Sequence, residues 1–399
     1  MMRLTYYSSW QTQCGVAEYS NFLLNGLRDI QQTDVDIVVE PFFKGSLLDT
    51  RLYYRSLGRT MNSGDLAHIQ HAHSFFGGRS PVRNSFRYFI QQVHIPIVLT
   101  AHDIFSDSIV SLPESENMIL NGSNEKSLNS RISMNFHHWI RKVIWPHYEN
   151  WYRTDLYQKV AAIIVHSDVH KRMLVNGGAP ETKIYVVPHG IPTEAVVAKD
   201  KLIGKTKWGL DDKIVLTIFG FMVPRKGYEL ALETLKALND QYILFIAGGT
   251  SKGKGSTYFT SLLEKIKIMG LEDRVVFSGF LPADSIPDAM AATDIVLAPF
   301  IESTGSGSLS FAIAYQKPIV ASDIAINVEI NSHSHCMSLF ANQNSEKLQE
   351  RILELANSSE IKSNLIKGCI EYSHKYSFHN VAKSIFDIYQ NIQPVNLSR

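Results

Sequence analysis

The stretch DIVLAPFIESTGSGSLSFAIAYQKPIVAS, residues 294–322, contains a strand, a glycine-serine loop, an apolar helix and a second strand. Both strands are continuous apolar runs, which is typical of parallel strands buried on both faces. Parallel strands require a crossover connection, and an apolar helix of this length provides one. The stretch therefore predicts an α/β fold in which the loop lies at the carboxyl end of a strand.

Similar apolar runs recur along both halves of the chain, and helix-compatible stretches separate most of them. The runs in the first half are LTYYS (4–8), VDIVVEP (35–41), LAHIQHAH (66–73), IPIVLTAHD (95–103) and AAIIVHS (161–167). Those in the second half are KIVLTIFG (213–220), QYILFIAGG (241–249), DRVVFSGF (273–280), DIVLAPF (294–300) and KPIVAS (317–322). Strands that alternate with helices predict doubly wound parallel sheets, and 399 residues suffice for two domains, joined near 186–200.

The overall composition restricts the class of protein. Lys and Arg number 39 against 38 Asp and Glu, so no global basic field indicates nucleic-acid binding. Cys14, Cys336 and Cys369 form no CxxC pair, which disfavours a disulfide framework or a zinc site. The start MMRLTYYSSW lacks the apolar segment of a signal peptide, and no window reaches about 18 uninterrupted apolar residues. We expect a cytoplasmic soluble enzyme or binding protein.

Ligands bind beyond the carboxyl ends of parallel strands, so the loops at those ends are the candidate site. Gly220 ends one strand and permits a tight turn. Arg225 and Lys226 follow it at the start of an amphipathic helix. Cations there oppose the helix dipole unless an anion shares the site. The pair predicts a diphosphate clamp, and the alternative is two solvated surface cations.

The loop 303–308 is the second candidate. Gly305 and Gly307 let backbone N–H groups approach a ligand, Ser306 and Ser308 add hydroxyl donors, and the following helix adds its positive end. An ordinary turn is the alternative. The Glu302 carboxylate would repel a phosphate, so it is better placed to bind the hydroxyl groups of a sugar.

Three further features lie in the first half. Gly15, in CGVAEYS (14–20), stands at a strand-to-helix turn that lacks the full GxGxxG pattern. His102, in LTAHD (99–103), ends a strand and is a candidate hydrogen-bond partner for a sugar hydroxyl; a structural role is the alternative.

The segment 135–153 mixes aromatic and basic residues, which suits a membrane interface or a lipid-linked acceptor. Its alternative is a helix packing aromatic residues on the sheet, although Pro146 interrupts it.

Together these stretches resemble the family-4 glycosyltransferases of the GT-B fold over nearly the whole chain. The resembling pieces are CGVAEYS (14–20), LTAHD (99–103), VVPHGIP (186–192), FGFMVPRKG (219–227), residues 274–300, residues 302–322 and YSFHNVAKSIFDIY (376–389). The resemblance implies two Rossmann-like domains facing a central cleft. Residues 1–192 would bind the acceptor, 193–375 the donor, and 376–399 would cross back as a helix to the first domain.

The resemblance also implies an activity. It is retaining transfer of a hexosyl residue (mannose, glucose or N-acetylglucosamine) from a nucleotide-diphosphate sugar to a saccharide or lipid-linked acceptor, in polysaccharide or glycoconjugate synthesis. Neither a metal nor a cofactor is expected, nor is nucleic acid. GDP-mannose is favoured slightly over UDP-glucose or UDP-N-acetylglucosamine. The location would be cytoplasmic, with peripheral membrane contact through 135–153.

Roles carry over residue by residue. Lys226 matches the phosphate-binding lysine with Arg225 as its helper, and the loop from Gly305 to Ser308 would donate backbone N–H bonds. Glu302 matches the first carboxylate of a paired-glutamate motif. His102 matches the histidine facing the transferred sugar, and Gly15 the loop beside the diphosphate.

Two positions depart from the family pattern. Phe221 stands where an arginine is common, and Ser310 stands where a second glutamate would hold the ribose. A serine could still bond a ribose hydroxyl, but neutral hydrogen bonds contribute about 1 kcal/mol against roughly 1.5–3 for charged ones. Arg225 as a substitute for the missing arginine is a hypothesis that an Arg225→Ala variant with unchanged donor binding would exclude.

Other functions fit the same fold. A sugar-nucleotide epimerase would need no acceptor, and a phosphorylase would generally need a longer chain. A non-catalytic partner subunit would explain the loss of the ribose glutamate. The retention of Lys226, Glu302 and His102 argues against that last reading.

Overall fold

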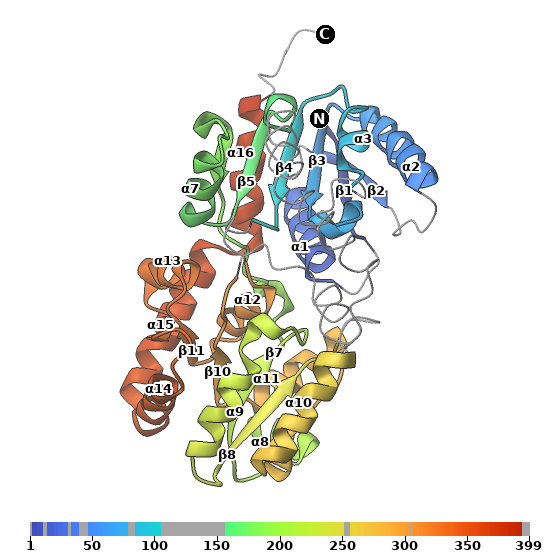
Figure 1. Ribbon diagram of the computed structural model, residues 1–399. Coiled ribbons are helices and arrows are strands. Elements are labelled where there is room, and N and C mark those ends of the chain that lie inside the picture. Colours follow the sequence, from blue (N-terminus) through green and yellow to red (C-terminus); the bar gives the residue numbers. More distant parts are fainter. Residues whose placement is uncertain are drawn as a thin grey trace, which may run out of the picture. The chain divides into compact units, whose positions relative to one another are not determined.

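A computed structural model describes residues 2–10, 14–30, 33–39, 47–78, 84–104, 156–250, 256–303 and 305–392 (Figure 1). Its contacts define two compact units. Unit 1 comprises Met1–Thr12, Gln31–Val186 and Phe386–Arg399, and unit 2 comprises Gln13–Ile30 and Val187–Ile385. Each unit contains a parallel sheet with helices, so the predicted α/β fold with two doubly wound sheets is confirmed. The domain limits expected from the sequence remain a prediction.

The described part of unit 1 forms a six-stranded sheet in the order β2-β1-β3-β4-β5-β6. Every neighbouring pair is parallel. The strands are β1 (Met2–Ser8), β2 (Thr33–Val39), β3 (Leu66–His71), β4 (Ile97–Ala101), β5 (Ala162–Val165) and β6 (Ile184–Val186). The helices are α2 (Leu47–Thr60), α3 (Phe86–Ile90) and α7 (Asp168–Asn176), with 3-10 turns η1 (Met61–Ser63), η2 (His73–Phe76) and η5 (Glu181–Lys183).

Unit 2 forms a second parallel sheet in the order β12-β11-β10-β7-β8-β9. Its strands are β7 (Ile214–Phe219), β8 (Tyr242–Ala247), β9 (Val275–Phe277), β10 (Ile295–Ala298), β11 (Ile319–Ser322) and β12 (Ser338–Phe340). The helices are α1 (Gly15–Asp29), α8 (Lys201–Trp208), α9 (Tyr228–Ala237), α10 (Ser256–Met269), α11 (Ile286–Ala292), α12 (Gly307–Ala314), α13 (Ala325–Ser334), α14 (Ser345–Asn357) and α15 (Ser359–Lys375). The 3-10 turns are η6 (Thr193–Ala195), η7 (Pro224–Lys226), η8 (Glu272–Arg274) and η9 (Ala283–Ser285).

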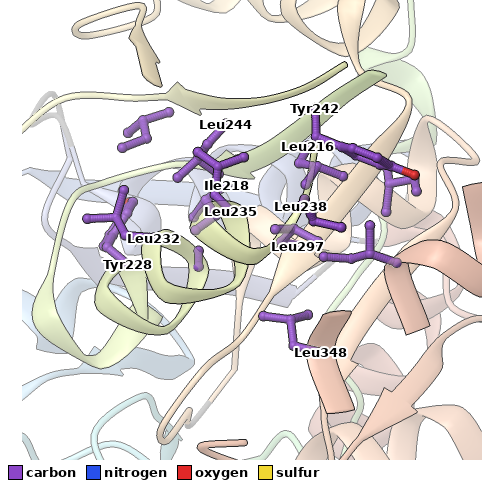
Figure 2. Close-up of a cluster of buried hydrophobic side chains, with 14 of the residues drawn as sticks. Leu216, Ile218, Tyr228, Leu232, Leu235, Leu238, Tyr242, Leu244, Leu297 and Leu348 are labelled. Carbon is purple, nitrogen blue, oxygen red and sulfur yellow. The ribbon is translucent and has the colours of Figure 1, made fainter. Parts of the chain in front are cut away.

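The core of unit 2 shows why these runs form these elements (Figure 2). Leu232 and Leu235 of α9 pack with Leu216 of β7 and Leu244 of β8, and all four are at most 1% exposed. Burying each such side chain stabilises the fold by roughly 1.5–3 kcal/mol. The apolar residues that recur at the helical period of α9 therefore pack against the continuous apolar strands of the sheet.

The last helix, α16 (Phe378–Ile392), divides between the units: residues up to Ile385 belong to unit 2 and those from Phe386 to unit 1. Within unit 2 it packs closely on α1 at Gly26. A Cβ on Gly26 would lie 2.8 Å from the Ala382 Cβ, so this contact requires a glycine.

None of the helices in the described ranges is long and apolar enough to cross a bilayer. The segment 135–153, for which membrane contact is predicted, lies outside the described residues.

Candidate active site

The candidate site of unit 2 lies where β7 and β10 end side by side. The chain leaves β7 toward β8 and returns to the other side of β7 as β10, so the strand order reverses between these two neighbours. Ligands of doubly wound sheets bind beyond the carboxyl ends of the strands at such a reversal. The loops predicted from the sequence, 220–227 and 302–308, follow these two strands.

Gly220 is the point at which the two loops meet. It has φ 93°, and a Cβ there would lie 2.8 Å from Lys226 Nζ and 3.1 Å from the Ser308 Cβ. Lysine and serine therefore flank the bare backbone of one glycine. We call Gly220, Lys226 and Ser306–Ser308 the Gly220 cradle. In this cradle the RKG turn and the glycine-serine loop lie next to each other at Gly220.

The turn before α9 is held against the end of β10. Gly227 has φ 73°, and a Cβ on it would lie 2.0 Å from the Pro299 carbonyl oxygen, which only glycine avoids. The Ile301 N–H donates to the Arg225 carbonyl over 2.9 Å. These contacts place Arg225 and Lys226 in η7, one turn ahead of α9, with the Arg225 side chain exposed.

Lys226 has an unusual electrostatic environment. Its Nζ donates to the Phe219 carbonyl oxygen over 2.5 Å. Burial of the ammonium, reinforced by the positive charge of Arg225, lowers the pKa of Lys226 to about 7. Desolvating an ammonium is unfavourable, and a bound anion would offset this cost. The arrangement is therefore a candidate anion site.

The second side of the cradle is the start of α12. The Ser306 Oγ caps the helix by accepting from the Leu309 N–H over 3.2 Å, and it lies 2.9 Å from the Ser308 Oγ. Gly307 is the first helical residue, with open space where a Cβ would lie. First-turn amides have no acceptor inside their helix and favour an anion. The Gly305 N–H, by contrast, donates to the Ser303 Oγ over 3.3 Å.

Glu302 precedes this loop with a partly buried side chain. Among the residues that the structure describes, its carboxylate has no hydrogen-bond or ion-pair partner. A carboxylate accepts strong hydrogen bonds from hydroxyl groups. Its position in the chain agrees with the predicted contact to sugar hydroxyls, which remains a prediction.

Ser310 is buried inside α12, and its hydroxyl already has protein partners. The Ser310 Oγ lies 2.9 Å from His189 Nδ1 and 3.1 Å from the Ser306 carbonyl oxygen. His189 also packs edge-on against Tyr19 of α1. The role of Ser310 in ribose binding stays a prediction. His189 is the neighbour that sequence reasoning missed, although its stretch VVPHGIP (186–192) is one of the pieces that carry the family resemblance.

Gly15 begins α1, where the Cys14 Sγ accepts from the Ala17 N–H over 3.4 Å. Open space surrounds the position of a Cβ on Gly15. Contacts group α1 with unit 2 although it lies early in the chain.

His102 belongs to unit 1 and directly follows β4. Its N–H donates to the His71 carbonyl over 3.0 Å, and its Nε2 lies 2.6 Å from the Gln70 Oε1. Burial, with the charge of His73, keeps the pKa of His71 well below its ordinary value, so this edge of the sheet carries a neutral imidazole. Over the described ranges no cluster of three or more His, Cys, Asp or Glu is arranged to hold a metal. A metal-free reaction stays a prediction.

Comparisons with known proteins identify the family. The model for "Glycosyl transferases group 1" matches residues 199–372, and the model for "Glycosyltransferase Family 4" matches residues 22–195. Together they cover most of the chain, and the two sheets are those of the GT-B fold. The chain belongs to the GT-B glycosyltransferases of the family-4 type.

Curated relatives match only in part. A mannosylfructose-phosphate synthase of Agrobacterium fabrum is 26% identical over 175 residues, 41% of this chain and 38% of that protein. A D-inositol 3-phosphate glycosyltransferase of Stackebrandtia nassauensis is 23% identical over 237 residues, 57% of this chain and 53% of that protein. The matched segments thus span about half or less of these relatives.

Solved structures match over nearly the full length. HepE of Anabaena in complex with UDP-glucose has a TM-score of 0.74 at 17% identity, covering 98% of this chain and 100% of that one. Sucrose-phosphate synthase of Thermosynechococcus elongatus has a TM-score of 0.71 at 13% identity, covering 98% and 99%. At these identities the likeness shows the fold.

Proposed function

We propose that the protein transfers a hexosyl residue, with retention, from a nucleotide-diphosphate sugar to a saccharide or lipid-linked acceptor. The observation that carries the proposal is the Gly220 cradle, in which a partly buried lysine and a helix N-terminus flank one glycine. The bond between the anomeric carbon and the diphosphate oxygen breaks, and its electron pair leaves with the diphosphate. Fixed donors aimed at that developing charge lower the barrier.

The remaining parts of the proposal concern the two sugars. The acceptor hydroxyl bonds to the anomeric carbon, and its proton passes to the leaving diphosphate. Glu302 and His102 would bind hydroxyls of the transferred sugar. GDP-mannose is the donor favoured by the sequence, and UDP-glucose is bound in HepE. A panel of nucleotide sugars separates these two donors.

Thermal unfolding with UDP, GDP, ADP and their sugars tests the proposal. One nucleotide family should raise the unfolding temperature, since a ligand at about 100 times its Kd adds about 2.7 kcal/mol to the free energy of unfolding. Release of nucleoside diphosphate with an added acceptor then shows transfer. Stabilisation by none of the nucleotides would favour the non-catalytic subunit, and turnover of donor without acceptor would favour the epimerase.

Gly220→Ala should weaken binding of the stabilising nucleotide by roughly 10- to 100-fold, the loss of about one charged hydrogen bond. The new Cβ would lie 2.8 Å from Lys226 Nζ and displace the ammonium from the cradle. Titration calorimetry measures the effect.

Gly270→Ala is the matched control for this change. Gly270 also has positive φ, 66°, but nothing lies within 4 Å of its Cβ position. Both variants therefore acquire similar backbone strain, roughly 1–2 kcal/mol. Equal nucleotide affinity in the two variants would contradict the cradle.

A further inference from the structure

A buried chain of hydrogen bonds leads from His102 to the last helix within unit 1. The Gln70 amide joins His102 to His68. The Gln70 Oε1 lies 2.6 Å from His102 Nε2, and the Gln70 Nε2 lies 3.1 Å from His68 Nε2. The Thr100 Oγ1 lies 2.7 Å from the same His68 nitrogen. At the other side of the ring, His68 Nδ1 contacts the Tyr389 hydroxyl of α16.

The strand geometry brings these groups together. His68 and Gln70 are two residues apart on β3, so their side chains lie on the same face of the sheet. Gln70 pairs in register with Thr100 of β4, and His102 follows two residues later. His68, Gln70, Thr100 and Tyr389 are fully buried. Buried polar groups without partners are costly, so each member of such a network constrains its neighbours.

The network determines where each imidazole carries its proton. Burial lowers the pKa of His68 to about 3, so this ring is neutral and one nitrogen donates while the other accepts. The Gln70 amide N–H donates to His68 Nε2, which leaves the His68 proton on Nδ1, facing the Tyr389 oxygen. The Gln70 carbonyl oxygen must then accept from His102 Nε2–H. One amide orientation thus fixes both tautomers.

We propose that Gln70 is a positioning residue for His102, and that Tyr389 sets the orientation of Gln70 through His68. In this arrangement His102 carries a proton on Nε2 and donates it to the Gln70 Oε1. The role of His102 toward a sugar hydroxyl rests on the proposed function. The tautomer relay itself does not require substrate, so it can be tested separately.

Nitrogen-15 NMR of histidine-labelled full-length protein tests the relay. Wild type should show His102 protonated on Nε2 and His68 protonated on Nδ1, with signals assigned by single histidine substitutions. In Tyr389→Phe, His68 Nδ1–H loses its acceptor, so the proton should move to Nε2 and the Gln70 amide should turn over. His102 should then switch toward the Nδ1-protonated form, although the mutation lies in another element.

Two variants at Gln70 and one control variant complete the test. Gln70→Met keeps the shape but removes both amide contacts, so the signal of His102 protonated on Nε2 should be lost. Gln70→Glu keeps an acceptor and should restore it. Tyr185→Phe in β6 of the same unit is the control and should leave His102 unchanged. An unchanged His102 signal in both Tyr389→Phe and Gln70→Met would overturn the relay.

Kinetics separates this inference from the proposed function. Tyr389→Phe should lower kcat by roughly fivefold, the equivalent of about one neutral hydrogen bond, with little change in the KM for donor. Gln70→Glu should recover more of the rate than Gln70→Met. If the NMR switch occurs while kcat is unchanged, the relay is supported and the role of His102 in transfer is contradicted.

Discussion

Lys226→Met should lower kcat for sugar transfer by about 10²- to 10³-fold, the loss measured when one preorganised donor to a developing oxyanion is removed. Methionine fills the same space but offers no charge to the leaving diphosphate. Steady-state release of nucleoside diphosphate measures the change. Lys236→Met, an exposed lysine in the last turn of α9, is the matched control and should remain within about twofold of wild type.

The depressed pKa of Lys226 gives this prediction a second readout. At pH 8 the free protein holds Lys226 largely neutral, because its pKa is about 7. A bound diphosphate favours the ammonium, so binding of a nucleotide sugar should take up about one proton. Calorimetry in buffers of different ionisation enthalpy measures the uptake. Lys226→Met should abolish it, and the same uptake in the variant would contradict the assignment.

The free energy of unfolding should also depend on pH through Lys226. The folded state binds fewer protons at Lys226 than the unfolded state between pH 7 and the ordinary lysine pKa, so stability rises with pH across that window. Below pH 7 both states are charged and the folded state bears the full desolvation cost. Lys226→Met should therefore gain most stability relative to wild type at low pH.

Glu302→Ala should lower kcat/KM for the donor by roughly 10- to 100-fold, since hydrogen bonds to a charged group contribute about 1.5–3 kcal/mol. Glu302→Gln should lose less, because an amide still accepts a hydrogen bond. Initial rates at low donor concentration give the values. Glu346→Gln, at an exposed carboxylate in the first turn of α14, is the control and should be neutral.

Deoxygenated donors show whether Glu302 meets a sugar hydroxyl. If it does, one deoxy sugar should be a poor substrate for wild type yet no worse than the full sugar for Glu302→Ala. Additive losses for every deoxy position would mean that the carboxylate and the hydroxyls act independently. That result would remove Glu302 from the sugar site.

Prediction from sequence worked for the strands because burial on both faces leaves a continuous apolar signal. The runs at 213–220 and 241–249 became β7 and β8 within a few residues of their ends. β12 was not predicted, because three residues carry too little pattern to separate a strand from a loop. The network of His68, Gln70 and Thr100 was not predicted either, since a polar residue inside an apolar run resembles a surface position.

The sequence by itself determined the α/β class, the strand ends and the residue types at those ends, because each depends on neighbours within a few positions. Only the tertiary structure decided which ends meet. Lys226 and Ser308 flank Gly220 because β7 and β10 are adjacent strands, although about 80 residues separate them in the chain. Ser310 lies next to His189 within unit 2, and His102 is linked to Tyr389 within unit 1, because the fold of each unit brings together segments that lie far apart in the chain. Contacts of this kind depend on where the fold places distant segments, and patterns over a few neighbouring residues do not record that.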